Sequence, residues 1–174
     1  MAKSRATIEN RFYELSQKQI SNYNRLLFEI IRDSKTREKY IDVISKNEMP
    51  QSALWKYGVS GDLPIVLVKI KNINDVYMVR ELIDAIRYFR LKNILIDLIV
   101  LDEEKDEKYI LESIRRYIEL KGVSYMLNAN GGVHMLLKEK VSEQDENLFY
   151  AVADVILDAE KGFLKEQLGG DNEK

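Results

Sequence analysis

The sequence predicts an α/β fold in which a small, mostly parallel sheet of three or four strands is flanked by helices and preceded by a helical arm. Two short apolar runs, 65–68 and 95–101, are typical of strands buried on both faces of a sheet. A segment with apolar residues at helical spacing follows each run. Strands that alternate with helices of crossover length favour parallel pairing through right-handed connections.

The helical arm is predicted from residues 7–45. Apolar side chains recur there at spacings of three and four, and neither Gly nor Pro occurs before Pro50. Asp33 and Ser34 interrupt the pattern, so we expect a second short helix capped by Thr36. We therefore predict an arm over 1–50, an α/β domain over 51–168 and a disordered tail over 169–174.

The rest of the chain predicts four further elements. A helix is expected to open at Asn74 and Asp75, and another to stop at Gly122. Residues 133–138 predict a third strand, and Ser142 is expected to cap a last helix that continues to Ile156. Residues 123–127 are a candidate fourth strand at the edge of the sheet. The sequence leaves the order of the strands open.

Composition excludes several classes of partner and site. Positive and negative side chains nearly cancel to a net charge of −2, so no nucleic acid partner is expected. The chain has no cysteine and one histidine, His134, and we expect neither a metal nor a cofactor. No apolar run approaches the roughly 20 residues that span a bilayer. We therefore expect no membrane insertion by this chain, and a cytoplasmic location.

The polar segment before the first predicted strand is the main candidate for a contact site. Trp55 and Tyr57 could stack on a sugar, while Ser60 and Asp62 bind its hydroxyls or a neighbouring polypeptide and Gly61 permits close approach. The alternative is structural: Trp55 and Tyr57, with Leu54, form an apolar plug between the arm and the sheet, and the turn leads into a buried strand. We favour the structural interpretation, because ligands of open α/β sheets bind beyond the opposite, carboxyl ends of the strands.

Asp102 and Glu103 are a weaker candidate, an acidic site just after the second predicted strand. Paired carboxylates can serve acid/base catalysis or hold a hard metal ion. An acidic loop before a helix is also favourable without any site, because negative charge suits a helix N-terminus. His134 is expected to be a half-buried strand residue. No residue is assigned a catalytic role.

One resemblance is carried by residues 54–70, LWKYGVSGDLPIVLVKI. They closely resemble a stretch of bacterial cyclic β-1,2-glucan synthases and related glycoside phosphorylase-type proteins. The similarity continues in order through residues 79–82, 88–92, 96–101, 131–133, 153–158 and 162–168. It implies a non-barrel α/β segment in the phosphorylase-like half of a large multidomain enzyme, and it brings no catalytic residue with it.

Three functions are compatible with these observations. The leading hypothesis is a non-catalytic scaffold or interdomain module of a carbohydrate-active enzyme, with other domains or subunits of a β-glucan synthase or phosphorylase as partners. The second is a carbohydrate-binding module for β-glucans. The third is a small independent α/β enzyme that uses the carboxylates at the strand end.

Overall fold

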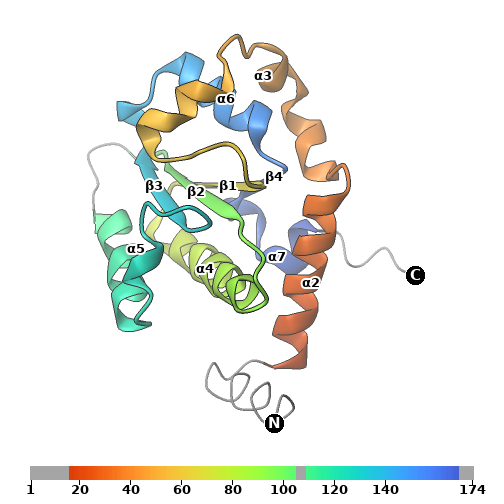
Figure 1. Ribbon diagram of the computed structural model, residues 1–174, viewed down its shortest axis with the longest axis vertical. Coiled ribbons are helices and arrows are strands. Elements are labelled where there is room, and N and C mark those ends of the chain that lie inside the picture. The colour runs from red at the N-terminus through yellow and green to blue at the C-terminus, as the bar shows by residue number, and fades with distance from the viewer. Residues whose placement is uncertain (1–15, 105–108, 169–174) are drawn as a thin grey trace.

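The computed structural model describes residues 16–104 and 109–168 and contains one sheet of four parallel strands in the order β3-β2-β1-β4 (Figure 1). The register places Val66 of β1 between Leu98 of β2 and Val155 of β4. The predicted α/β fold is confirmed. The strands are β1 (Ile65–Ile70), β2 (Asp97–Asp102), β3 (Val133–Leu137) and β4 (Val155–Asp158).

Helices cover both faces of the sheet and make a three-layer arrangement (Figure 1). Helices α4 and α5 lie below the sheet in Figure 1, and α3 and α6 lie above it. The helices are α2 (Gln17–Ile31), α3 (Ile41–Ser45), α4 (Val76–Leu91), α5 (Tyr109–Leu120), α6 (Glu143–Val152) and α7 (Leu164–Gln167). Short 3-10 helices cover Lys35–Tyr40, Gln51–Tyr57, Ile73–Asp75, Ser124–Met126, Lys138–Lys140 and Ala159–Lys161.

Alternate residues of the buried strands point into two separate cores, as the period of two in a strand requires. Val66 and Val100 belong to the core shared with α2, α4 and α5. Leu67 and Ile99 belong to the core shared with α6 and the segment 51–59. Because both faces are packed, the two central strands consist of continuous apolar runs, which is why the sequence revealed them.

The first described helix, α2, begins after Ser16, whose side chain accepts a hydrogen bond from the Gln19 amide. The predicted interruption at 33–34 is confirmed, because α2 ends at Ile31. The predicted cap was wrong: the side chain of Ser34, and not that of Thr36, caps the next helical segment. Residues 1–15 of the predicted arm lie outside the described residues.

Two predictions about strands were wrong. Residues 123–127 form a 3-10 helix over Ser124–Met126 in place of an edge strand. The last helix ends at Val152, and the residues after it form β4, paired with β1. The carboxylate of Asp154 accepts a hydrogen bond from the Ile65 amide at 2.9 Å, which ties the start of β4 to the start of β1.

The division of the chain at residue 50 stays a prediction. Helices before that position contribute to the same two cores as the rest, through Tyr23 and Leu26 of α2 and Ile44 of α3. The predicted tail at 169–174 lies outside the described residues. Within residues 16–104 and 109–168, no helix has the length and apolar content needed to cross a membrane.

Candidate functional site

The main candidate site is the surface at the amino end of β1, which we call the junction surface: Gln51, Trp55, Ser60, Gly61 and Asp62. A 3-10 helix carries the first two residues and ends at Gly58, whose φ of 80° reverses the chain. The turn that follows carries the other three and leads into β1. The structure therefore places the turn at the amino end of the strand, as predicted.

Trp55 is exposed yet held in one orientation. Its side chain retains 66% of its accessible surface, and the indole Nε1 donates a hydrogen bond to the Ser60 carbonyl oxygen at 3.1 Å. A buried indole usually has a hydrogen-bond partner for its N–H group. Here the N–H group is satisfied by the chain itself, and much of the ring stays open to a ligand.

Gln51 completes the junction surface, although no local feature of the sequence predicted it. Its side-chain amide donates to the Ser60 carbonyl and to Asp62 Oδ1, both at 3.1 Å. Gly61 makes this possible: its φ is +85°, and a Cβ atom there would lie 2.5 Å from Gln51 Cγ. A side chain at position 61 would therefore meet both backbone strain and steric overlap.

The apolar plug predicted for this segment exists in part, because Leu54 and Tyr57 pack on the core and Trp55 does not. Leu54 and Val59 are fully buried against the core that contains Phe149. Trp55, the third residue of the predicted plug, faces outward. Helical spacing explains the difference, because adjacent residues of a helix point in different directions and only one of them can face the sheet.

Tyr57 belongs to the packing side of this segment rather than to the junction surface. Its ring meets Phe149 edge to face at a centroid distance of 5.1 Å, and its hydroxyl donates to Asp145. Burial, and then the Asp145 carboxylate, raise the pKa of Tyr57. Burial opposes ionisation of Asp145, but hydrogen bonds from Lys56 and Tyr57 outweigh it and hold the pKa of Asp145 below its usual value.

Asp102 and Glu103 do not form a carboxylate pair, because they point to opposite faces of the sheet. Asp102, the last residue of β2, is fully buried on the face that holds Val100. Glu103 lies 3.7 Å from the Lys138 ammonium, which is also 3.7 Å from Glu146 of α6 on the other face. The use of these carboxylates in an independent enzyme stays a prediction.

Asp102 is energetically unusual. One carboxylate oxygen accepts the Glu104 amide at 3.0 Å, while the other is buried without a hydrogen-bond partner among the described residues. Burial raises the pKa of Asp102, and the neighbouring acidic side chains add to the effect. An unpaired buried oxygen costs free energy when the group is ionised.

His134 is fully buried, not half-buried as predicted, and it pairs with Asp97. Its Nε2 lies 3.0 Å from Asp97 Oδ1, which also accepts the Gly131 amide at 2.7 Å. Both side chains have no accessible surface. The pair therefore links β2 and β3 at the amino end of the sheet, away from solvent.

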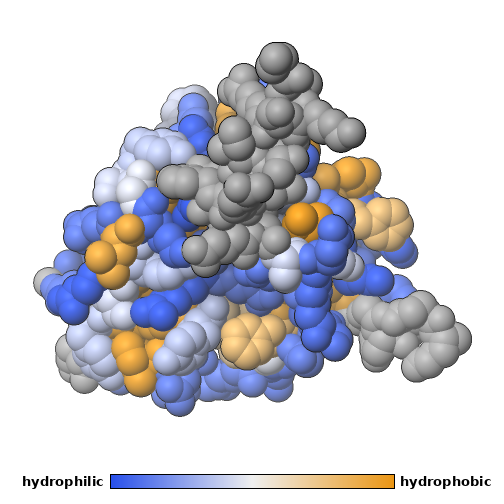
Figure 2. All heavy atoms as spheres, turned by 90° about the horizontal axis from the view of Figure 1, so that it is seen from below, coloured by the Kyte–Doolittle hydropathy of each residue, from blue (hydrophilic) through white to orange (hydrophobic). Residues whose placement is uncertain are grey.

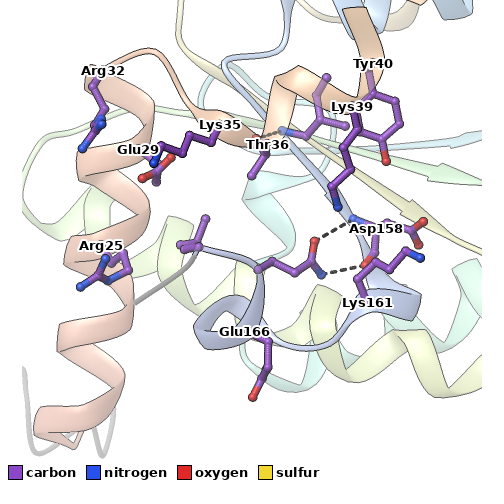
Figure 3. Close-up of a pocket in the computed structure, with 13 residues that line it drawn as sticks. Arg25, Glu29, Arg32, Lys35, Thr36, Lys39, Tyr40, Asp158, Lys161 and Glu166 are labelled. Carbon is purple, nitrogen blue, oxygen red and sulfur yellow. Dashed lines mark hydrogen bonds between the residues drawn. The ribbon is translucent and has the colours of Figure 1, made fainter. Parts of the chain in front are cut away.

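A cavity of about 620 Å³ lies at the free edge of β4, between α2, the 3-10 helix at Lys35–Tyr40 and the residues that follow β4 (Figure 3). The side chains of Lys39 and Lys161 extend toward Asp158, and Glu29 and Glu166 also line it (Figure 3). Side chains of both charges therefore share this cavity. None of the residues of the junction surface lines it.

Metal binding has no candidate among the described residues, since they contain no cluster of three or more histidine or acidic side chains placed to hold an ion.

Comparison with known proteins gives one informative similarity. No family model matches the chain. Over 126 residues, or 70% of its length, the chain is 26% identical to the cyclic beta-(1,2)-glucan synthase NdvB of Rhizobium meliloti (strain 1021). The matched stretch is 4% of that protein, so this chain spans only a small part of the relative's length. The similarity supports a distant relationship between this chain and a carbohydrate-active enzyme.

Proposed function

We propose that this chain is a non-catalytic β-glucan-binding module of a carbohydrate-active enzyme system, with Trp55 as its stacking platform. The observation that carries the proposal is the exposed indole whose orientation is fixed by its own hydrogen bond to Ser60. An aromatic ring offers a large, flat apolar face to the C–H groups of a pyranose. A ring that is already oriented loses little conformational entropy when the sugar binds.

The polar surroundings of Trp55 favour a sugar over a protein partner. Gln51 and Asp62 are exposed beside it and offer an amide and a carboxylate to sugar hydroxyls. Within residues 51–64, all of which the structure describes, Trp55 is the one large apolar side chain that is strongly exposed. A protein interface usually has a broader apolar centre.

One face of the molecule agrees with this choice. Figure 2 shows one face of the molecule, on which apolar side chains are dispersed among hydrophilic ones. An interdomain scaffold would be expected to carry a contiguous apolar patch. The distant similarity to a cyclic beta-(1,2)-glucan synthase supports a β-1,2-glucan as the ligand class.

A fluorescence titration tests the proposal, because the chain contains one tryptophan and its emission reports on Trp55 alone. Adding β-1,2-linked glucooligosaccharides is expected to give a saturable change in emission in the millimolar range. Asp62→Ala and Gln51→Ala are expected to weaken binding, whereas Ser52→Ala, an exposed neighbour outside the junction surface, serves as the control. The proposal fails if the emission does not respond to millimolar sugar.

One observation favours a second candidate, the interdomain scaffold. The matched stretch makes up 4% of the Rhizobium protein, so in that protein it is surrounded by much more chain. A scaffold would bind those neighbouring parts. Adding this chain to the Rhizobium protein with its matched stretch deleted should then give a complex that co-elutes in size-exclusion chromatography. Separate elution would remove this candidate.

A further inference from the structure

A second, smaller cavity lies where an open α/β sheet is expected to bind a ligand. The strand order β3-β2-β1-β4 means that the chain runs outward from β1 through β2 to β3 and then returns to the other side of β1. The switch point of the sheet therefore lies between the carboxyl ends of β1 and β4, the usual position of a binding crevice. A cavity of about 330 Å³ is found there. Asn72, Asn74, Asp75 and Met78 line it from the segment after β1, and Ala159, Glu160, Gly162 and Phe163 line it from the segment after β4.

The side chains that line this switch-point cavity match the chemistry of an uncharged sugar. Asn72, Asn74 and Glu160 supply amide and carboxylate groups, which can donate to and accept from hydroxyls. Phe163 adds an aromatic ring that keeps 49% of its accessible surface. No lysine or arginine lines the cavity, so it offers little to an anionic ligand.

Internal hydrogen bonds occupy some of these groups and leave others available. Asp75 accepts the backbone amides of Lys71 and Asn72 at 2.7 and 3.0 Å, so its role is to hold the loop. Glu160 is close to the side chains of both Asn72 and Lys71, at 3.4 and 4.0 Å. The side-chain amide of Asn74 is exposed and makes no hydrogen bond with the described residues. Asn74 and Phe163 are therefore the groups to which a ligand would add contacts.

We infer that the switch-point cavity binds a single uncharged hexose unit, with Asn74 bonding its hydroxyls and Phe163 packing on its ring. The volume lies at the lower end of the range for small-molecule sites, which fits one sugar ring better than an oligosaccharide. The choice of glucose as the hexose rests on the proposed glucan binding. The cavity itself is separate from Trp55, because the six residues of β1, about 20 Å, lie between the two places.

The test uses the full chain carrying Trp55→Ala, so that only the cavity is observed. Glucose and a β-1,2-linked glucose disaccharide are titrated against the ¹⁵N-labelled protein, and backbone amide shifts are followed by NMR. Saturable shifts are expected at Asn74, Glu160 and Phe163. Asn74→Ala and Phe163→Ala are each expected to raise the dissociation constant about five-fold, the effect of one lost hydrogen bond or a comparable contact.

Tyr125→Ala is the matched control, because Tyr125 is an aromatic residue of similar exposure, 59%, that does not line the cavity. Its dissociation constant should equal that of the parent chain. Shifts confined to other regions, or shifts that survive both cavity variants, would overturn the inference. Cavity binding without a Trp55 response in the unmodified chain overturns only the proposed function. A Trp55 response without cavity shifts overturns only this inference.

Discussion

The side-chain hydroxyl of Thr36 accepts a hydrogen bond from the backbone amide of Ile156 at 3.0 Å, although the two residues lie 120 positions apart. Ile156 is in β4, the edge strand, so this hydroxyl takes a place that a neighbouring strand would otherwise fill. Gln167 does the same further along β4, accepting the Asp158 amide at 3.1 Å and donating to the Asp158 carbonyl at 2.7 Å. Side chains thus cover a sheet edge that would otherwise be open to pairing.

Thr36→Val is expected to destabilise the protein by about 1 kcal/mol, because it keeps the shape of the side chain and removes the acceptor of the Ile156 amide. Urea denaturation measures the loss, and hydrogen exchange should show faster exchange at Ile156. Thr36→Ser keeps the hydroxyl and is the control for exchange. Equal exchange at Ile156 in both variants would contradict the proposed role of this bond.

Gly61→Ala is expected to cost more stability than Gly122→Ala. Both glycines have positive φ, +85° and +72°, but a Cβ atom at Gly61 would meet Gln51 whereas one at Gly122 meets nothing within 4 Å. The backbone term alone is about 1 kcal/mol, and the overlap at Gly61 adds to it. Thermal denaturation compares the stability of the two variants. An equal loss of stability would show that the Gln51 side chain moves away from a Cβ atom at position 61 without a free-energy cost.

The wrong prediction for β4 shows where sequence periodicity fails. Val155 and Ile156 continue the three- and four-residue spacing of Phe149 and Val152, so the pattern alone extends the helix. The chain leaves the helix at Ala153, and the strand is fixed by pairing with β1 and by the bond from the Ile65 amide to Asp154. These contacts join residues about 90 positions apart and leave no local signal in the sequence.

The junction surface was only partly predictable, for a similar reason. The glycine-containing turn at 60–62 and the aromatic residue at 55 are local features of one segment. Whether Trp55 or Tyr57 is the exposed aromatic residue depends on packing against α6, where Tyr57 contacts Phe149 and Asp145. The cavities were not predictable, since their walls come from segments far apart in the chain.

Asp102→Asn is expected to gain stability relative to the unmodified protein as the pH rises. Burial raises the pKa of Asp102 in the folded state, so the folded protein holds this proton more tightly than the unfolded chain does. Ionising the buried Asp102 lowers the stability of the unmodified protein. This loss of stability is absent below the unfolded-state pKa of about 3.9 and is complete above the raised folded-state pKa. Each pKa unit of difference corresponds to about 1.4 kcal/mol.

Urea denaturation at several pH values between acid and neutral conditions measures this effect. The stability of Asp102→Asn minus that of the unmodified protein should increase through the acid range and then level off. Ser52→Ala, an exposed substitution that removes no acidic group, controls for general effects of pH. A difference that stays constant with pH would mean that the Asp102 carboxylate is as well solvated in the folded protein as in the unfolded one.

Asp97 and His134 are expected to be energetically coupled. His134→Leu leaves a fully buried carboxylate whose remaining hydrogen bond within the described part of the chain is from the Gly131 amide, and removing one member of such a pair costs about 3 kcal/mol. Asp97→Asn keeps an acceptor for Gly131 but removes the charge. The double variant should therefore lose less stability than the sum of the two single variants. A double-mutant cycle by chemical denaturation measures the coupling, and additive losses would mean that the two side chains contribute independently.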